Sequence, residues 1–367
     1  MSNAQWQRIT ERFREGIDKG EFRAGDRLPS DARLAEEYGV SRPTAHRALA
    51  ELARLGLVER NKRGTVVAGP LAKATGRVAL IVDHTADRYD FPSAELIRGM
   101  QCGLGNDRNL LLCDSRDSAE RERQLMIEMA EQCDGVFLVP IGAGENADLY
   151  HTPPGPTVVL DRIPEAATGY AVLSDNRDAT FRAVRELQRL GHRNIAFLGF
   201  HKPENPTVEE RHAGYCDAMG EDRPSLSRFL SLDLEREGGV RFRQAVEDAL
   251  MNLVKGSHEA TAVFCVQDMI ALAALDVADA LGWSVGVDFD ISVFNEWPPA
   301  LLRQPWRVHR IVPQRFEIGR SAAERLTQLI EGQIAEPRVV RVEAKLLTVD
   351  RLLSESKGAT SEIHANY

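Results

Sequence analysis

The sequence predicts an α/β protein with a small, mainly helical domain in front of a larger domain built from parallel sheets. Two observations lead to this prediction. In the first 70 residues, three short helical patterns separated by Gly and Pro are followed by two short strand-like runs. From residue 77 onward, short apolar runs alternate with amphipathic segments, which is typical of parallel strands covered by helices on both faces.

The composition is that of a globular protein. The 367 residues are enough for two or three domains, and 43% of them are hydrophobic and 28% charged. No apolar run reaches the roughly 18 residues that cross a bilayer, and the opening MSNAQWQRITERFREG lacks the apolar core of a secretory signal. The five cysteines occur singly, without CxxC pairs, which argues against disulfides and structural zinc. We therefore expect a cytoplasmic protein without membrane association.

Charge is unevenly distributed along the chain. Residues 1–70 hold 13 Lys and Arg against 10 Asp and Glu, a net charge of +3. The remaining residues hold 33 against 45, a net charge of −12. Such an asymmetry is a reason to interpret the two parts separately, although a basic excess of this size proves little by itself.

The first part of the chain has the pattern of a helix followed by a helix-turn-helix. A helix over residues 4–19 is predicted by four apolar residues at helical spacing: Trp6, Ile9, Phe13 and Ile17. Ser30 is a good N-cap for a short helix over residues 31–38, and Ser41 caps a third helix that runs to residue 55. Two helices joined by so short a turn are typical of a helix-turn-helix.

Two short strands complete a winged helix. They are predicted at residues 57–60 and 65–68, around a basic tip that contains Arg63. Outside its apolar face, the third helix carries groups that bind phosphates and base edges near its N-terminal end, the end that usually enters the major groove: Arg42, Thr44, His46 and Arg47. Arg63 on the wing would reach the DNA backbone or the minor groove. The alternative is that these cations only form a solvated face.

The segment GDRLPSDARLAEEYGVSRPTAHRALAELARLGLVERNKRGTVV resembles the DNA-binding domain of GntR-family transcription regulators. Matching positions include Leu28-Pro29-Ser30, Gly39-Val40-Ser41-Arg42 and Gly56-Leu57. The resemblance implies that DNA is contacted by Arg33, Ser41, Arg42, Thr44 and Gly64. His46 departs from the family, which commonly has Arg at this position.

The chain is expected to divide into a DNA-binding domain at residues 1–69, a linker at 70–76, an effector-binding and dimerisation domain at 77–352 and a disordered tail at 353–367. Apolar strands of the large domain are expected at 78–82, 110–113, 135–139, 157–160, 170–173, 195–199, 262–266 and 291–294. About 270 residues are many for one sheet, so we expect two lobes with a cleft between them.

Enzyme motifs are missing from the large domain. No GxGxxG follows a strand, and there is no GxxxxGK[ST] phosphate loop, GxSxG elbow or HExxH helix. The nine histidines are dispersed. The sequence therefore predicts neither an enzyme nor a cofactor or metal site.

Several segments of the large domain resemble the effector-binding module of LacI/GalR-family repressors, which is similar to periplasmic sugar-binding proteins. They include CDGVFLVP, LSDNRDATFRAVRELQRLGHRNIAFLGF and IVPQRFEIGRSAAERLTQLIEG. A GntR-type winged helix joined to this module resembles chimeric regulators of the arabinose-repressor type.

This second resemblance implies a ligand pocket. Asp161 follows the fourth strand, Arg211 opens an R-x-x-Gly-Tyr segment, and Gln267-Asp268 stands where the family usually has Asn-Asp. Further candidates are Gln314 at the pocket edge, Phe91 as a stacking surface, and Glu296, in Asn295-Glu296-Trp297, as a replacement for the family's Asp. Other roles are favoured for Asp268, which would cap a helix, and for Asp175 and Asn176, which would serve as hinge and helix-capping residues.

Together these features predict a ligand-responsive transcription regulator, with repression favoured over activation. A homodimer would bind a palindromic double-stranded operator, and a small sugar-like molecule between the lobes would change operator affinity. A small-molecule binding protein without a regulatory role and a sugar-phosphate or nucleotide enzyme are the alternatives. Purines and amino-acid derivatives also occur as ligands on this scaffold.

Overall fold

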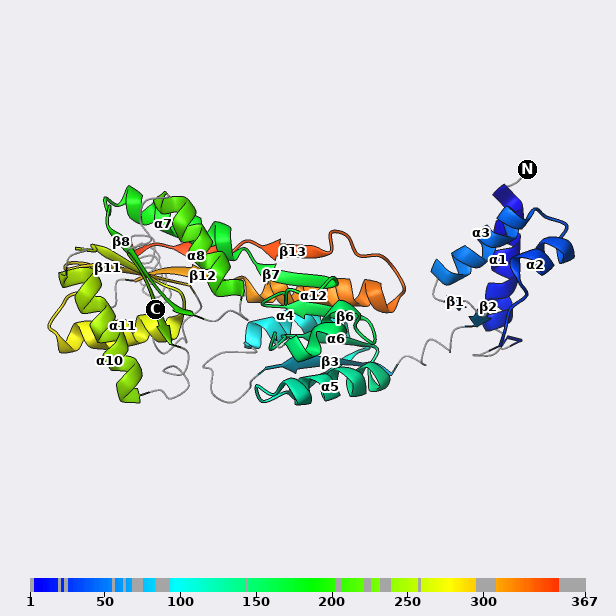
Figure 1. Cartoon of the computed structure of the whole chain (residues 1–367), viewed down its shortest axis with the longest axis horizontal. Coiled ribbons are helices and arrows are strands. Elements are labelled where there is room, and N and C mark those ends of the chain that lie inside the picture. Colours follow the sequence, from blue (N-terminus) through cyan, green and yellow to red (C-terminus); the bar gives the residue numbers. More distant parts are fainter. Residues whose placement is uncertain are drawn as a thin grey trace, which may run out of the picture.

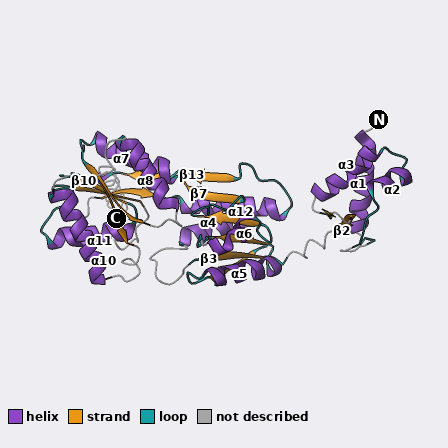
Figure 2. Ribbon diagram, in the orientation of Figure 1, coloured by secondary structure: helices purple, strands orange, loops and turns teal. Residues whose placement is uncertain are grey.

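A computed structural model describes most of the chain. The described residues are 3–18, 21–22, 26–54, 57–61, 64–67, 75–83, 93–142, 144–201, 206–220, 226–231, 239–256, 259–294 and 308–349. They form a small N-terminal domain and two α/β lobes (Figures 1 and 2). Residues 70–74 of the predicted linker and the predicted tail at 353–367 lie outside them.

The N-terminal domain is the predicted winged helix-turn-helix. It contains α1 (Asn3–Asp18), α2 (Asp31–Glu37), α3 (Arg42–Arg54) and an antiparallel pair of strands, β1 (Val58–Asn61) and β2 (Gly64–Val67). The helices surround their own apolar core, whose buried residues include Ile9, Phe13, Leu34, Leu49 and Leu52. Because this core is filled by the domain's own side chains, the three helices and the wing hold one another in place.

The first lobe contains a six-stranded parallel sheet in the order β13-β7-β6-β5-β3-β4. Its strands are β3 (Arg77–Val82), β4 (Asn109–Asp114), β5 (Gly135–Leu138), β6 (Thr157–Leu160), β7 (Tyr170–Ser174) and β13 (Val339–Val342). Its helices are α4 (Ala94–Leu104), α5 (Ala119–Gln132), α6 (Ala147–His151) and α12 (Arg315–Ile330), with a 3-10 turn at Gly144–Asn146.

The alternation of side chains along β3 explains how both faces of this sheet are covered. Val78 and Leu80 belong to one apolar cluster, which includes residues of α4 and α12. Ala79 and Ile81 point to the other face and pack in a cluster with residues of α5.

The second lobe contains another six-stranded sheet, in the order β14-β12-β11-β10-β8-β9. Its strands are β8 (Ile195–His201), β9 (Ser227–Ser231), β10 (Ala262–Cys265), β11 (Asp290–Phe294), β12 (Val308–Val312) and the antiparallel β14 (Lys345–Leu347). Its helices are α7 (Asn176–Arg189), α8 (Pro206–Met219), α10 (Gly239–Leu250) and α11 (Asp268–Ala280), with a π-helical turn at Met251–Lys255.

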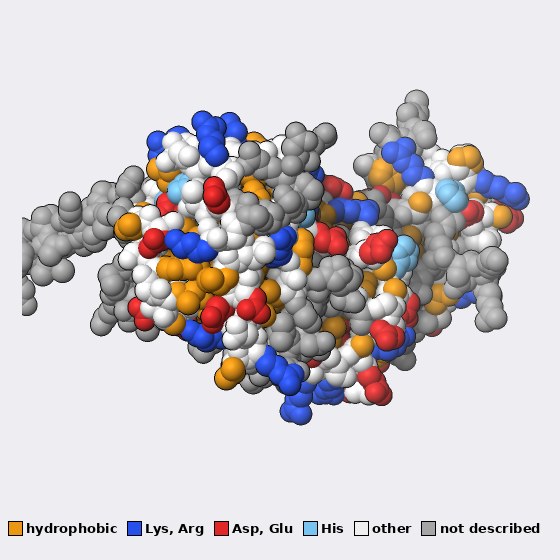
Figure 3. All heavy atoms as spheres, turned by 60° about the vertical axis from the view of Figure 1, so that its left-hand side comes forward, with side chains coloured by type: hydrophobic (Ala, Val, Ile, Leu, Met, Phe, Trp, Pro, Cys, Tyr) orange, Lys and Arg blue, Asp and Glu red, His pale blue; other side chains and the backbone are white. Residues whose placement is uncertain are grey.

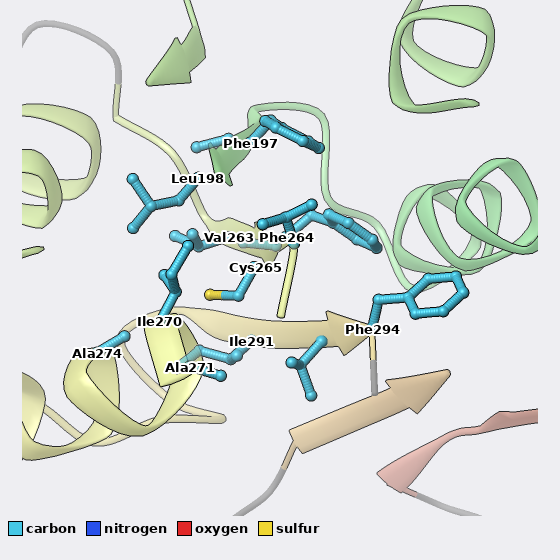
Figure 4. Packing of buried hydrophobic residues seen from close by; sticks show 14 of the residues in the cluster. Phe197, Leu198, Val263, Phe264, Cys265, Ile270, Ala271, Ala274, Ile291 and Phe294 are labelled. Atoms are coloured by element: carbon cyan, nitrogen blue, oxygen red, sulfur yellow. The ribbon is translucent and has the colours of Figure 1, made fainter. Parts of the chain in front are cut away.

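The core of the second lobe is apolar and rich in aromatic rings. Phe197 of β8 and Phe264 of β10 stack with centroids 5.8 Å apart, and Ile270 of α11 packs in the same cluster (Figure 4). Phe294 ends β11, at the carboxyl end of the sheet. The strand therefore leads directly from the core to the edge where parallel sheets usually bind ligands.

The chain passes between the lobes three times. The crossovers lie between β7 and α7, between β12 and α12, and between β13 and β14. Thus α12 packs on the first lobe although it follows a strand of the second. Its seam with α4 is exceptionally close: a Cβ atom added at Gly99 would lie 2.0 Å from the carbonyl oxygen of Phe316.

None of the helices in the described part of the chain has the length and apolar character of a membrane-spanning segment. In the space-filling view, basic and acidic side chains are interspersed over the visible face (Figure 3).

Candidate DNA-binding surface and effector site

The N-terminal end of α3 is organised by Ser41. The backbone N–H of Thr44 donates to Ser41 Oγ at 3.4 Å, and the hydroxyls of Ser41 and Thr44 lie 2.8 Å apart. Ser41 and Arg42 are exposed. Within the described ranges, the Arg42 guanidinium makes no hydrogen bond or ion pair, so it extends from a fixed helix end.

Two other predicted DNA contacts of α3 have partners inside the domain. His46 Nδ1 lies 2.9 Å from Asp31 Oδ2, which links α3 to the start of α2. The guanidinium carbon of Arg47 lies 4.6 Å from the centroid of the Trp6 ring, a cation–π contact with α1. Both side chains thus contribute to the packing of the helices, and their contacts with DNA stay predictions.

The remaining predicted DNA contacts are Arg33, Gly64 and Arg63. Arg33 is an exposed residue of α2, and its backbone N–H donates to the N-cap Ser30. Gly64 begins β2 with φ +131°, a backbone conformation that favours glycine, so the wing requires this residue whatever its role toward DNA. Arg63 lies outside the described residues.

In the second lobe, Arg211 is held at the carboxyl end of the sheet. Its Nη1 donates to the carbonyl oxygen of Val266 at 2.8 Å, and its Nε donates to Asn176 Oδ1 at 2.9 Å. The guanidinium carbon lies 3.7 Å from the centroid of the Phe294 ring. Three contacts therefore fix the plane of the guanidinium just beyond β10 and β11.

The electrostatic surroundings of Arg211 come from both lobes. Burial lowers the pKa of Arg211 to about 10, with nearby Asp161, Glu210 and Asp268 raising it and Arg315 lowering it. The side chain thus stays cationic at neutral pH. Since Asp161 belongs to the first lobe, two of the residues predicted for the effector site interact electrostatically across the lobes.

Asp161 follows β6 in the first lobe. It has a φ of +65°, and its Oδ2 accepts a hydrogen bond of 3.0 Å from Arg162 Nη1. Arg162 also donates to the carbonyl oxygen of Pro140 at 2.6 Å and forms a buried ion pair with Asp83. These residues follow β3, β5 and β6, so a polar network lies along the carboxyl ends of three adjacent strands.

Arg162 is a site residue that sequence reasoning missed. Its burial opposes the charge, but the neighbouring carboxylates of Asp83 and Asp161 raise the pKa of its guanidinium. The signal was an arginine two residues after a buried strand, in VVLDRIP. A cation at such a place requires a buried partner, which here is Asp83.

A second missed network anchors the loop after β5. Glu122 of α5 is fully buried, accepts from the backbone N–H of Ile141 at 2.7 Å and from Asn146 Nδ2 at 2.9 Å, and is hydrogen-bonded to the Tyr150 hydroxyl. Burial raises the pKa of the Glu122 carboxyl. This network orders the segment that leads to the Arg162 contact at Pro140.

Two other predicted effector contacts lie directly before helices at the same edges. Gln267 directly precedes α11, and its side chain does not cap the helix. Gln314 directly precedes α12, and its Nε2 donates to the carbonyl oxygen of Val312 at 3.3 Å. Phe91 and Glu296, like its neighbours Asn295 and Trp297, lie outside the described residues.

The capping roles assigned to two aspartates need correction. Asp268 is the first residue of α11 rather than its N-cap, although its Oδ1 accepts from the N–H of Met269 at 2.9 Å. Asp175 does precede α7, but its side chain makes no capping bond. It accepts instead from the N–H of Ala344 and from Arg182, because the third crossover passes beside it.

No cluster of three or more His, Cys, Asp and Glu side chains in the described ranges is arranged to hold a metal ion.

Comparisons with known proteins agree with this architecture. Residues 5–67 match the model of bacterial regulatory proteins of the gntR family, and residues 184–348 match that of periplasmic binding protein-like domains. The chain joins a domain that matches the gntR model to a periplasmic-binding-protein-like domain. It is a transcription regulator, as both sequence resemblances predicted.

Relatives cover most of this two-domain chain. The HTH-type transcriptional regulator AscG of Escherichia coli is 26% identical over 88% of this chain and 98% of its own length. The arabinose metabolism transcriptional repressor of Geobacillus stearothermophilus is 26% identical over 86% of this chain and 88% of its own.

Solved structures share the fold of the periplasmic-binding-protein-like domain. Transcription regulator CcpA of Lactococcus lactis superposes with a TM-score of 0.62 at 20% identity, over 74% of this chain and 97% of its own. The complex of transcriptional regulator CelR with cellobiose gives a TM-score of 0.62 at 21% identity, over 88% and 99%.

Proposed function

We propose that this regulator is a repressor whose affinity for operator DNA is set by a small sugar-like effector bound between the two lobes. The observation that carries the proposal is the placement of Arg211. Its guanidinium is fixed beside Phe294 at the carboxyl edge of one lobe, within electrostatic reach of Asp161 from the other. A molecule bound there would contact both lobes and so favour one lobe angle.

The chemistry of these groups suits a hydroxyl-rich ligand. Arg211 donates hydrogen bonds and Asp161 accepts them, the pairing that adjacent sugar hydroxyls satisfy. Gln267 and Gln314 supply further amides at the same edges, and Phe91 and Glu296 are proposed to complete the site. The complex of CelR with cellobiose supports a sugar as the class of effector.

On the DNA side, we propose that a homodimer places two α3 helices in major grooves about one helical turn apart on a palindromic operator. The proposed contacts are Arg33, Ser41, Arg42, Thr44, His46, Arg47, Arg63 and Gly64. The proposed domain boundaries are residues 1–69 and 77–352, and the proposed location is the cytoplasm, where the operator lies.

The effector is tested by thermal unfolding of the full chain with sugars, polyols, sugar phosphates and purines. A ligand at a hundred times its Kd adds about 2.7 kcal/mol of stability, which raises Tm by a few degrees. We expect the shift to disappear in Arg211→Ala and Asp161→Ala. A shift that survives in both variants would place the effector elsewhere, and no shift with any compound would remove the support for a sugar sensor.

The DNA surface is tested by selecting bound sequences from random duplexes with the purified protein. We expect a palindromic site, for which Arg42→Ala lowers the affinity by about 1–3 kcal/mol because a cation at a base edge or phosphate is lost. Arg14→Ala, an exposed change on α1, is the control and should leave the affinity unchanged. Absence of any preferred sequence would contradict operator binding.

A further inference from the structure

An ion pair connects the two lobes beside the proposed effector site. Glu210 belongs to α8 of the second lobe, and Arg341 belongs to β13, an edge strand of the first-lobe sheet. Arg341 Nη2 lies 2.7 Å from Glu210 Oε1, and Nη1 lies 3.2 Å from Oε2. Figure 1 shows α8 next to β13 where the lobes meet. The pair is therefore a bidentate contact between the lobes.

The same carboxylate is connected to Arg211 through one buried amide. Asn176 Nδ2 donates to Glu210 Oε2 at 2.9 Å, and Asn176 Oδ1 accepts from Arg211 Nε at 2.9 Å. Asn176 is 1% exposed, so its partners alone determine how the amide is oriented. Arg211, Asn176, Glu210 and Arg341 thus form a continuous chain of hydrogen bonds.

This hydrogen-bond chain includes a residue of the first crossover and lies next to the third. Asp175, next to Asn176, donates its backbone N–H to the carbonyl oxygen of Val342 at 3.1 Å and accepts from the N–H of Ala344 at 2.7 Å. The first and third crossovers are thereby bonded to each other at the residue adjacent to the amide. A change at Asn176 acts directly on the segments whose conformation sets the lobe angle.

We propose that the Glu210–Arg341 pair is an interlobe brace that couples effector binding at Arg211 to the lobe angle through Asn176. The coupling rests on the proposed function, because it requires an effector at Arg211. A ligand that accepts hydrogen bonds from the remaining N–H groups of Arg211 pulls on the guanidinium that Asn176 binds at Nε, which alters the contact of Asn176 with Glu210. Coupling of this kind is reciprocal. If the effector shifts the equilibrium between lobe angles by a given factor, then fixing the lobe angle changes effector affinity by that same factor.

The brace is tested first without any effector, by hydrogen exchange of the full chain. We expect Glu210→Gln and Arg341→Gln each to accelerate exchange of the amides of Asp175 and Ala344 by about 2- to 5-fold, as fits a partly exposed pair. The double variant should add little to Glu210→Gln, because that change already disrupts the contact that Arg341→Gln removes.

Arg189→Gln is the matched control. Arg189 forms a bidentate pair with Glu186 at 2.8 Å, but both residues lie on α7 within one lobe. This variant should leave exchange at Asp175 and Ala344 unchanged. Equal acceleration in the control, or none in Glu210→Gln and Arg341→Gln, would overturn the brace.

The coupling is tested with arabinose, cellobiose and fructose 1-phosphate as probes on the selected operator. For a probe that stabilises the wild type, Arg341→Gln should reduce the probe-induced change in operator affinity by about 2- to 5-fold. An undiminished change would overturn the coupling. If no probe binds the wild type, the sugar effector loses its support, whereas the exchange experiment still decides whether the brace exists.

Discussion

At the scale of single residues, one carboxylate at the amino end of the second-lobe sheet binds two histidines and connects the segments that carry them. Asp290 Oδ2 lies 3.0 Å from His192 Nε2 and 3.5 Å from His309 Nε2. The two histidines hold the pKa of Asp290 far below its usual range. Because the pKa is lower in the folded than in the unfolded chain, the carboxylate stabilises the fold above about pH 4, and this contribution is lost as the pH falls.

Asp290→Asn is therefore expected to lower the free energy of unfolding at pH 7 by about 1–3 kcal/mol, the range for a partly buried charged hydrogen bond. Below pH 4 the difference from the wild type should shrink, since the wild-type carboxylate is then losing its contribution. Urea unfolding of the full chain at several pH values measures both effects. Asp276→Asn, an exposed change on α11, is the control, and an equal loss of stability in it would contradict this interpretation.

How far single residues were predictable depended on how far away their partners lie in the sequence. Arg211 and Asp161 stand in motifs that resemble a known module, so the sequence located them. Arg162 and Asp83 pair across 79 residues, and a local sequence pattern does not show that two residues so far apart are in contact. For the same reason, the contact of Arg47 with Trp6 could not be predicted: helical spacing places Arg47 off the core face of its helix but does not identify its neighbour.

At the scale of elements, the α4–α12 seam depends on glycines. Added Cβ atoms at Gly99 and Gly319 would lie 2.0 Å from the Phe316 carbonyl oxygen and 2.2 Å from the Leu96 carbonyl oxygen. These neighbours are backbone atoms, which cannot rotate away. The helices approach so closely because neither side chain is present at the seam.

Gly99→Ala is expected to destabilise the protein by about 1–3 kcal/mol, because the helices must separate to admit a methyl group. Thermal unfolding of the full chain measures the loss. Cys102→Ala, an exposed change on the same helix, should stay within about 0.5 kcal/mol of the wild type. If the two variants were equally stable, the seam would not require glycine.

Strands were predictable from the sequence where each one is a continuous run of apolar residues. Buried strands such as β3 and β10 are continuous apolar runs and were predicted close to their observed bounds. The strands β9, β12, β13 and β14 were not predicted. β9, β13 and β14 lie at sheet edges and have mixed polarity, and the interior strand β12 contains a histidine and an arginine that interrupt its apolar pattern. That β13 pairs with β7, far earlier in the sequence, becomes visible only in the folded chain.

At the scale of the whole molecule, the proposed function requires two copies of the chain, because a palindromic operator has two half-sites. The first lobe offers an uncovered apolar edge for this purpose. Leu111 and Leu112 of the edge strand β4 are 37% and 51% exposed, and Ile127 of α5 is 42% exposed. Large apolar side chains on an edge strand favour pairing with another chain.

We therefore expect Leu112→Glu to weaken dimerisation at least about tenfold, since burying one leucine contributes about 1.5–3 kcal/mol and a buried unpaired carboxylate is unfavourable. Sedimentation equilibrium of the full chain measures the dimer Kd. Operator affinity should fall with it, because two tethered half-site contacts become independent ones. Val287→Glu, at an exposed apolar residue of the second lobe, is the control. A Leu112→Glu protein that remains dimeric would exclude this edge as the interface, and an operator affinity unchanged in a monomeric variant would show that one copy of the winged helix is enough.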